Sequence, residues 1–326
     1  MKIARWRDAS GTADEGFVIV GKAVPFPDGL TVADVLERGL GFAVELYDSV
    51  ADARGSDLGS VRLLAPLRPA AIRDFVAFEE HVEGVSASVD GTSEVVPEWY
   101  QAPTFYFTNP HTVLGPDQPV TPPMTERLDF ELEVAAVIGG LEGSDGANLD
   151  AGAAARHIFG YTIMNDWSAR DLQSREMKVR LGPAKGKDFA TSLGPWIVTS
   201  DELATYLDAD GFLAVRAEAW VNGELLGEDL VSNMGWPFAE LVSYASRNSR
   251  VVPGDVLGSG TVGNGGCLAE LWGRGGELLP PPLHEGDEVR MVVEGIGELT
   301  SVVGPTVPAP VVQRARIRSR ARERDF

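Results

Sequence analysis

The chain has 326 residues, 44% of them hydrophobic, and its 28 basic and 48 acidic residues give a formal net charge of −20. This length and composition can support a substantial core, while the negative field makes nucleic acid and anionic membranes poor partners. The only cysteine, Cys267, excludes a disulfide within the chain, and the sequence has neither a signal-peptide pattern nor a membrane-span pattern. We therefore expect a cytoplasmic protein.

Residues 1–68 are predicted to form a small N-terminal α+β domain. Segments 17–20 and 61–64 have the composition of short strands. Thr31 is a predicted N-cap for a helix that extends to Arg38. The proline-bearing segment 65–72, APLRPAAI, then indicates a domain boundary.

Residues 69–312 are predicted to form a larger domain that consists mainly of strands. Its Asn222-Gly223 pair between apolar flanks is typical of a type I′ hairpin. Asp150 is a predicted cap for an alanine-rich helix, and Pro237 fits the first turn of a helix that reaches about residue 246. The predicted strands are 105–107, 128–138, 256–257, 267–272 and 289–293. The expected fold class is therefore α+β, mainly β with some α.

The final segment, 313–326, carries arginine at every second position from Arg314 to Arg324 and is predicted to be a separate tail. One interpretation is a docking arm for an acidic partner. The other is a disordered tail beside an acidic protein surface.

Two carboxylates alternate with apolar residues in the segment LDFELE, residues 128–133. On a β-strand, Glu131 and Glu133 would project to one face, while Phe130 and Leu132 would project to the other. Two carboxylates on one face repel each other unless a cation lies between them. The alternative interpretation is a solvated acidic face in an already acidic protein.

A polar run at residues 165–191, NDWSARDLQSREMKVRLGPAKGKDFAT, places acid, arginine, glutamine and lysine side chains between apolar segments. This density predicts a functional site. Asp74 and His81 lie upstream in RDFVAFEEH, and Glu270 follows a glycine-rich turn within 258–271. Together these residues indicate a carboxylate-bound metal with a histidine beside it.

The order of these motifs resembles that of the fumarylacetoacetate hydrolase family. The shared features are colinear from about Asp74 to Val303: D-F-x5-H, D-x-E-x-E, NDWSARDxQ with its GPxxGKxF continuation, the GSGT turn and the following E-L pair. The resemblance implies a mixed β-sandwich roll, a homodimer and a divalent metal. It also implies hydrolysis of a carbon–carbon bond in a β-diketo acid.

The resemblance implies four metal ligands, namely Asp74, Glu131, Glu133 and Asp166. Carboxylate oxygens are hard ligands that suit Mg²⁺, Mn²⁺ or Ca²⁺, whereas zinc more often recruits histidine or cysteine. We therefore expect Mg²⁺, with Mn²⁺ or Ca²⁺ as alternatives.

The resemblance also places Arg170, Gln173 and Lys187 against substrate oxygens. These side chains are suitable donors for stabilising the enolate that leaves when the carbon–carbon bond breaks. The alternative interpretation of Arg170 is a surface salt bridge to Asp166 and Asp171.

His81 is the predicted base that activates water, because the unperturbed pKa of histidine lies near the working pH. Glu270 is predicted to orient the imidazole, and the pair resembles the histidine–glutamate dyad of the family. The acidic neighbours Glu79, Glu80 and Glu83 predict a raised histidine pKa. An ordinary surface or helix-end histidine is the alternative.

Two more positions match substrate contacts of the family. Thr261 corresponds to a residue near the substrate carboxylate, and Tyr106 corresponds to an active-site tyrosine. The alternatives are a plain turn between strands for Thr261 and a core aromatic for Tyr106. Cys267 is predicted to be a small buried hydrophobic residue, not a nucleophile.

One position departs from the family. The eukaryotic-type enzyme carries, nine residues after its histidine, an arginine that contacts the distal carboxylate of fumarylacetoacetate, whereas this chain has Asp90. We therefore expect a neutral or smaller acyl end, as in an acylpyruvate or a related 2,4-diketo acid.

Three functions remain open at this point. The first is a metal-dependent hydrolase of a 2,4-diketo acid. The second is a 2-oxo acid decarboxylase, tautomerase or isomerase that uses the same metal site, and the third is a non-catalytic binding protein. The presence of both His81 and Glu270 favours hydrolysis, because hydrolysis requires an activated water.

Overall fold

Strands from both predicted domains join in one mixed sheet. The computed structural model describes residues 1–90 and 95–316, and in this part of the chain the sheet has 12 strands. Their order is β4-β3-β2-β1-β13-β11-β10-β16-β6-β7, with β5 beside β1 and β8 beside β13. The strands are β1 (Lys2–Arg7), β2 (Ala13–Ile19), β3 (Lys22–Pro25), β4 (Ser56–Asp57), β5 (Arg62–Leu64), β6 (Ile72–Phe75), β7 (Phe105–Thr108), β8 (Val113–Leu114), β10 (Leu132–Ile138), β11 (Ile158–Asp166), β13 (Thr191–Thr199) and β16 (Val256–Gly258).

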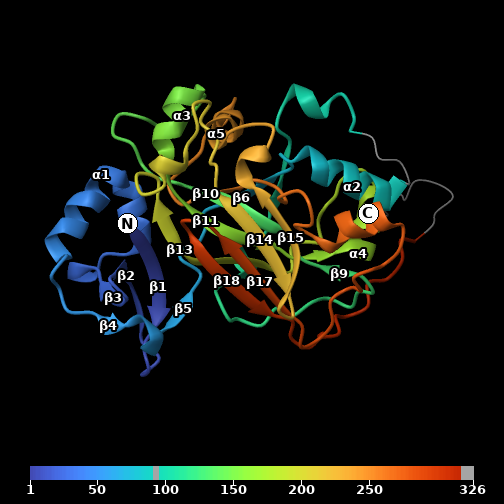
Figure 1. Cartoon of the computed structure of the whole chain (residues 1–326), viewed down its shortest axis with the longest axis horizontal. Coiled ribbons are helices and arrows are strands. Elements are labelled where there is room, and N and C mark those ends of the chain that lie inside the picture. Colours follow the sequence, from blue (N-terminus) through green and yellow to red (C-terminus); the bar gives the residue numbers. More distant parts are fainter. Residues whose placement is uncertain (91–94, 317–326) are drawn as a thin grey trace, which may run out of the picture.

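A second, four-stranded sheet lies across β10, β11 and β13 (Figure 1). Its order is β15-β14-β17-β18, and all its pairs are antiparallel. These strands are β14 (Arg216–Val221), β15 (Glu224–Leu230), β17 (Glu288–Val293) and β18 (Gly297–Val302), and a small pair is formed by β9 (Leu128–Asp129) and β12 (Ser168–Ala169). The predicted α+β fold with a mixed β-sandwich is confirmed.

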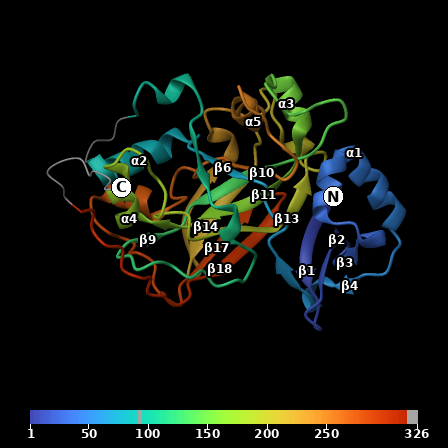
Figure 2. The ribbon, with the colours of Figure 1, turned by 180° about the vertical axis from the view of Figure 1, so that it is seen from behind.

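Helices lie at both ends of the molecule, and α3 and α5 lie between these ends, at the top of Figure 1. α1 covers the N-terminal strands at one end, whereas α2 and α4 lie at the other end, near the C-terminal mark in Figures 1 and 2. α6 packs against α2, and α3 packs against α5. The helices are α1 (Val32–Val50), α2 (Glu79–Asp90), α3 (Ala151–His157), α4 (Arg170–Met177), α5 (Phe238–Ser246) and α6 (Leu268–Gly275).

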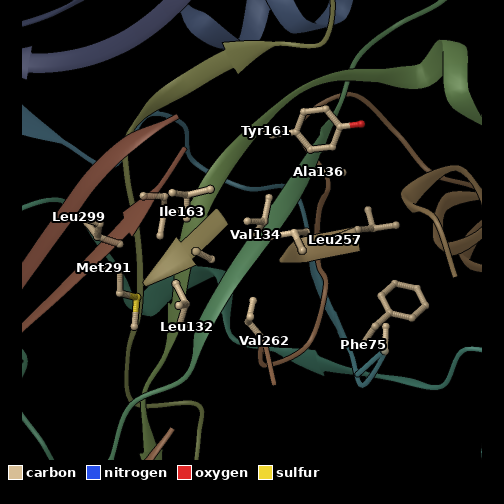
Figure 3. Packing of buried hydrophobic residues seen from close by; sticks show 14 of the residues in the cluster. Phe75, Leu132, Val134, Ala136, Tyr161, Ile163, Leu257, Val262, Met291 and Leu299 are labelled. Atoms are coloured by element: carbon tan, nitrogen blue, oxygen red, sulfur yellow. The ribbon is translucent and has the colours of Figure 1, made fainter. Parts of the chain in front are cut away.

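The main hydrophobic core lies between the two sheets. Figure 3 shows Leu132, Val134 and Ile163 of the central strands grouped with Met291 and Leu299 of the second sheet. Each of these side chains is at most 1% exposed. The alternate residues of the central strands point to the other face of the large sheet, where they meet a different set of partners.

The N-terminal module shares its sheet and its core with the rest of the chain. β1 pairs with β13, so the module extends the large sheet. Its core residues Phe17 and Leu36 belong to the same buried cluster as Val137 and Phe159 of the central strands. The domain boundary after residue 68 stays a prediction.

The N-cap predicted at Thr31 is confirmed. The Thr31 hydroxyl accepts the Asp34 N–H at 3.2 Å, and the Asp34 carboxylate accepts the Thr31 N–H at 2.9 Å. The helical conformation is interrupted at Gly39, where φ is 81°, and resumes to Val50. The helix is therefore longer than the predicted segment that ends at residue 38.

The hairpin and two later helices are also confirmed. Asn222 and Gly223 have positive φ values of 51° and 82°, as a type I′ turn requires. Asp150 accepts the Ala153 N–H at 2.7 Å and caps α3. Pro237 lies directly before α5, one residue earlier than the first turn that we predicted.

The strand predicted at 267–272 is wrong, because this segment forms the start of α6. Cys267 is its N-cap, and the Cys267 sulfur accepts the Glu270 N–H at 3.4 Å. Leu268 and Trp272 are both buried on the inner side of this helix. A short apolar run fits a buried helix as well as a strand, so its periodicity could not separate the two.

Two central strands, β11 and β13, were not predicted. All nine residues of β11 are buried, as are eight of the nine residues of β13. Strands covered on both faces lack the alternation of apolar and polar residues that identifies a half-buried strand.

The predicted C-terminal tail lies mostly outside the described residues. Residues 313–316 are exposed, and the structure does not describe the segment that follows them. No helix in the described ranges is both long enough and apolar enough to cross a membrane.

Candidate active site and metal centre

A cavity of about 360 Å³ opens beside β6, β7 and α2. Nine of the eleven predicted site residues line it, namely Asp74, His81, Tyr106, Glu131, Glu133, Arg170, Gln173, Lys187 and Thr261. The other two, Asp166 and Glu270, are fully buried next to lining residues. Segments far apart in the sequence therefore bring all the predicted groups to one place.

Three strands of the same part of the large sheet carry three of the carboxylates. Asp74 lies on β6, Glu133 lies on β10, and Asp166 is the last residue of β11. β16 lies between β6 and β10, and a Cβ atom added at its Gly258 would be 2.6 Å from Glu133 Oε2 and 2.8 Å from Asp74 Oδ1. A glycine at this position therefore leaves the space that the two carboxylates occupy.

Glu131 reaches the cavity from a different backbone position. It lies in the link between β9 and β10, not within the continuous strand that we predicted over 128–138. Its backbone N–H donates to Asn165 Oδ1 at 3.1 Å, which ties this link to the end of β11. The Glu131 carboxylate lines the same cavity as that of Glu133.

The four carboxylates are at most 3% exposed. Burial, together with the charge of a neighbouring carboxylate, raises the pKa of Asp74 and of Glu133. Burial also raises the pKa of Asp166, although Lys187 opposes it. Burial would raise the pKa of Glu131 as well, but its cationic neighbours, Lys187 foremost, hold that pKa below its usual range.

The carboxylate cluster fits a hard divalent cation. Asp74 Oδ1, Glu133 Oε1 and Asp166 Oδ1 are buried and find no hydrogen-bond partner within the described part of the chain. Carboxylate oxygens of Asp74, Glu131 and Asp166 lie within 4.8 Å of one another. Buried polar atoms without a partner are costly, and several converging oxygens match the ligand preference of Mg²⁺, Mn²⁺ and Ca²⁺.

Lys187 and Tyr106 hold the carboxylates from the cavity side. Lys187 Nζ donates to Asp166 Oδ2 at 2.5 Å and also pairs with Glu131. Tyr106 Oη donates to Asp74 Oδ2 at 2.9 Å and to Asp166. Tyr106 lines the cavity and is only half-buried, which does not support its alternative interpretation as a core aromatic.

Arg170, the first residue of α4, is a buried residue of the cavity wall. Its Nη2 atom lies 2.7 Å from Asp129 Oδ2 and 2.8 Å from Glu131 Oε1. The alternative surface bridge to Asp166 and Asp171 is wrong, because Arg170 is 7% exposed and its acidic partners are these two buried residues.

Asp129 was not predicted as a site residue. Besides Arg170, its carboxylate accepts the N–H groups of Leu268 at 2.8 Å and Ala269 at 3.0 Å. It therefore joins the start of α4 to the start of α6 and positions Arg170. Its place at the head of the D-x-E-x-E motif was the only signal in the sequence.

Gln173 and Thr261 complete the polar wall. Gln173 Oε1 accepts from Arg170 Nη1 at 3.1 Å, which fixes the orientation of the amide. Thr261 follows β16 in the glycine-rich segment and is 2% exposed. Both side chains line the cavity.

The imidazole of His81 lies between the carboxylate cluster and α6. Its Nε2 atom is 3.8 Å from Glu131 Oε1, and its Nδ1 atom is 3.7 Å from Cys267 Sγ. Glu270 lies close by, but its carboxylate pairs with Arg274 at 2.8 Å, and the described residues show no hydrogen bond in which it accepts from His81. The orienting role of Glu270 stays a prediction.

Burial lowers the pKa of His81 to about 4, although the nearby Glu131 carboxylate opposes this. The rise predicted from Glu79, Glu80 and Glu83 is wrong, because desolvation of the imidazole outweighs the influence of carboxylates. His81 is therefore neutral near pH 7 and can accept a proton.

Residues 70–304, more than half of the chain, match the family described as "Fumarylacetoacetate (FAA) hydrolase C-terminal". The chain belongs to the fumarylacetoacetate hydrolase family. The resemblance stated from its motifs is thus confirmed. The side chain of Asp90, which departs from the family pattern, lies outside the described residues, so the expected change at the acyl end stays a prediction.

Relatives with different reactions share this family. The fumarylacetoacetase of Arabidopsis thaliana is 29% identical over 310 residues, which cover 78% of this chain and 73% of the relative. The oxaloacetate tautomerase of Bacillus subtilis (strain 168) is 29% identical over 250 residues, covering 76% and 74%. The solved fumarylacetoacetate hydrolase of Exiguobacterium antarcticum matches with a TM-score of 0.68 at 26% identity, covering 94% of this chain and 99% of that one. The chain is an enzyme of a family that contains hydrolases and a tautomerase.

Proposed function

We propose that this chain is a divalent-metal-dependent hydrolase that cleaves the carbon–carbon bond of a 2,4-diketo acid, such as an acylpyruvate or a compound like fumarylacetoacetate. The observation that carries the proposal is one cavity in which a buried histidine, buried carboxylates and nitrogen donors face the same space. The proposal includes Mg²⁺ as the cation, with Mn²⁺ or Ca²⁺ as alternatives, and a cytoplasmic homodimer.

Asp74, Glu131, Glu133 and Asp166 are the proposed metal ligands. A divalent cation held there would supply Lewis-acid polarisation of a keto oxygen of the substrate. Lys187 donates to two of these carboxylates, so its charge lies at the same end of the cavity and can attract the carboxylate of the substrate.

His81 is the proposed base. Its Nε2 atom lies on the side of Glu131, and the neutral ring can take a proton from a water molecule. The water oxygen then bonds to the acyl carbon, and the bond from that carbon to the methylene carbon breaks. The electron pair leaves as the enolate of pyruvate, which takes up the proton held by His81.

Arg170 and Gln173 are the proposed donors to the developing enolate oxygen. Asp129 fixes the guanidinium of Arg170, and this guanidinium in turn fixes Gln173. Donors held before the reaction need no reorganisation when the negative charge forms.

The remaining lining of the cavity is largely apolar and supports an uncharged acyl group. Val82 and Val85 come from α2, Phe105 comes from β7, and Met177 ends α4. Apolar walls favour an apolar ligand by removing its surface from water.

A second function is favoured by the contacts of His81. Its Nδ1 atom contacts Cys267 Sγ. The histidine–glutamate dyad that would activate water instead needs a contact between His81 and Glu270. Tautomerisation, decarboxylation or isomerisation of a 2-oxo acid needs the enolate donors but depends less on an oriented base. The similarity to the oxaloacetate tautomerase of Bacillus subtilis supports this alternative.

A product assay separates the two functions. The protein is stripped with a chelator and given a panel of acylpyruvates with or without Mg²⁺ or Mn²⁺, while enol absorbance, pyruvate and free acid are measured. Metal-dependent release of both products, lost in His81→Ala and kept in the exposed control His284→Ala, is expected. Loss of absorbance without acid release would instead support the second function.

A further inference from the structure

Three metal-ligating side chains meet behind the cavity, outside the carboxylate cluster. His81 comes from α2, whereas Cys267 and Glu270 come from the start of α6, which packs against α2. One ligand atom from each lies within 4.8 Å of the other two. We infer that these residues form a second metal site, selective for a soft divalent cation such as Zn²⁺ or Cd²⁺, that blocks the active-site histidine when filled.

The separation of the imidazole and the thiol fits one shared ion. Zinc binds sulfur at about 2.3 Å and histidine nitrogen at about 2.0–2.1 Å, so a tetrahedral ion places these two ligand atoms roughly 3.6 Å apart. His81 Nδ1 and Cys267 Sγ are 3.7 Å apart. Two of the ligands therefore already have the spacing of neighbouring positions around a tetrahedral ion.

Glu270 supplies the third ligand from a buried oxygen. Its Oε1 atom accepts the Gly265 N–H at 3.2 Å and lies 2.8 Å from Arg274. Its Oε2 atom is buried and has no hydrogen-bond partner among the residues described. A buried carboxylate oxygen of this kind gains more from a cation than one that already has a partner.

The two metal sites differ in ligand chemistry. The carboxylate cluster offers oxygen ligands, which suit hard cations, whereas the second site offers the sulfur of Cys267, an imidazole and one carboxylate. Mg²⁺ is therefore expected to leave the second site empty, and Zn²⁺ or Cd²⁺ to prefer it. The second site borders the cavity, since the imidazole of His81 is part of the cavity wall.

Filling the second site would remove the base. An ion bound through Nδ1 leaves the remaining ring proton on Nε2, so this atom can no longer take a proton from water. The thiol of Cys267 loses its proton to solvent as the ion binds. This inhibitory consequence rests on the proposed function, whereas the binding itself does not.

Binding is tested with the tag-free full-length chain, stripped of metal and then given saturating Mg²⁺. Cd²⁺ is titrated while thiolate-to-cadmium charge-transfer absorbance and melting temperature are recorded. Cys267 is the only cysteine, so a thiolate band reports this site alone. The unaltered chain and the exposed control His284→Ala are expected to bind one equivalent with a rise in melting temperature.

Variants of the three ligands decide the result. Cys267→Ser is expected to lose the band, and His81→Ala and Glu270→Gln are expected to weaken Cd²⁺ binding at least about tenfold. Melting temperatures without Cd²⁺ show that each variant is folded. A missing band in the unaltered chain, or equal affinity in His81→Ala and Glu270→Gln, would overturn the proposed site.

Inhibition is tested separately on whichever acylpyruvate is turned over. Zn²⁺ is expected to inhibit the unaltered chain at a concentration at least about tenfold lower than the concentration that inhibits Cys267→Ser. Each rate is compared with the rate of the same protein without Zn²⁺. Equal sensitivity would overturn the blocking of His81. Absence of turnover would contradict the proposed function alone, because the absorbance result does not depend on it.

Discussion

One face of the large sheet changes from apolar to charged over two to four residues along its strands. The apolar row is Ile72 on β6, Val256 on β16 and Val137 on β10, and the charged region next to it contains Asp74, Gly258 and Glu133 on the same three strands. The side chains of these residues, glycine aside, are at most 2% exposed. Burial alone therefore does not separate residues that stabilise the fold from residues that form a site.

The difference lies in what burial does to each kind of side chain. Burying an aliphatic side chain contributes roughly 1.5–3 kcal/mol to stability, whereas burying a carboxylate costs free energy unless a partner compensates it. The raised pKa values of Asp74 and Glu133 show that this compensation is incomplete here. We infer that the charged region is maintained for ligand binding and the apolar row for stability.

Replacing Asp74 by asparagine should abolish function without unfolding the chain. Mg²⁺-dependent turnover is expected to fall roughly 100-fold or more, since even outer partners of metal ligands contribute 10–100-fold to affinity or activity. The melting temperature of the metal-free protein should stay the same or rise, because the repulsion from Asp166 is removed. A large drop in that melting temperature would contradict the assignment of Asp74 to binding.

Replacing Ile72 by alanine should have the opposite profile. This residue lies two positions before Asp74 on the same face of β6, and the change is expected to cost about 2–5 kcal/mol of unfolding free energy. The midpoint and slope of urea unfolding measure this cost. The Mg²⁺ affinity of the folded variant should stay close to that of the unaltered chain. A loss of Mg²⁺ affinity as large as that of Asp74→Asn would contradict the distinction between the apolar row and the charged region.

Replacing Glu270 by glutamine extends the comparison to a buried carboxylate with one charged partner. Burial raises the pKa of Glu270 to about 7 from 4.5. The folded state therefore binds this proton more tightly than the unfolded state, so this group lowers stability as pH rises from about 4.5 to 7. In the variant, the fall in unfolding free energy over this pH range should be smaller by up to about 3 kcal/mol.

Urea midpoints of the metal-free protein at pH 4.5, 6 and 8 measure this effect. Subtracting the two profiles isolates Glu270 from the other buried carboxylates. Parallel profiles would show that Glu270 has the same pKa in the folded and unfolded states, and would contradict the raised pKa.

Replacing Gly258 by alanine tests whether the glycine makes room for the carboxylates. The new Cβ would lie 2.4 Å from Met164 Cε and under 3 Å from two carboxylate oxygens, so a cost of about 1–3 kcal/mol and weaker Mg²⁺ binding are expected. Gly275→Ala is the matched control, because no heavy atom lies within 4 Å of its added Cβ. Thermal melting and Mg²⁺ titration of both variants provide the comparison.

Local signals in the sequence were sufficient for several elements. The capping pattern at Thr31 and the Asn222-Gly223 turn involve neighbouring residues, so their geometry follows from short-range chemistry. The strand β11 and the helix α6 were missed or mistaken because both are apolar runs whose form depends on what packs against them.

The sequence by itself determined the family, the fold class and most of the polar side chains that line the cavity, because these are encoded in motifs with distinctive spacing. Only the tertiary structure decided how these side chains are held. Asp129 meets the N–H of Leu268 across 139 positions of the chain, and His81 meets Cys267 across 186. The lowered pKa of His81 likewise comes from burial among distant segments, which spacing along the chain does not specify.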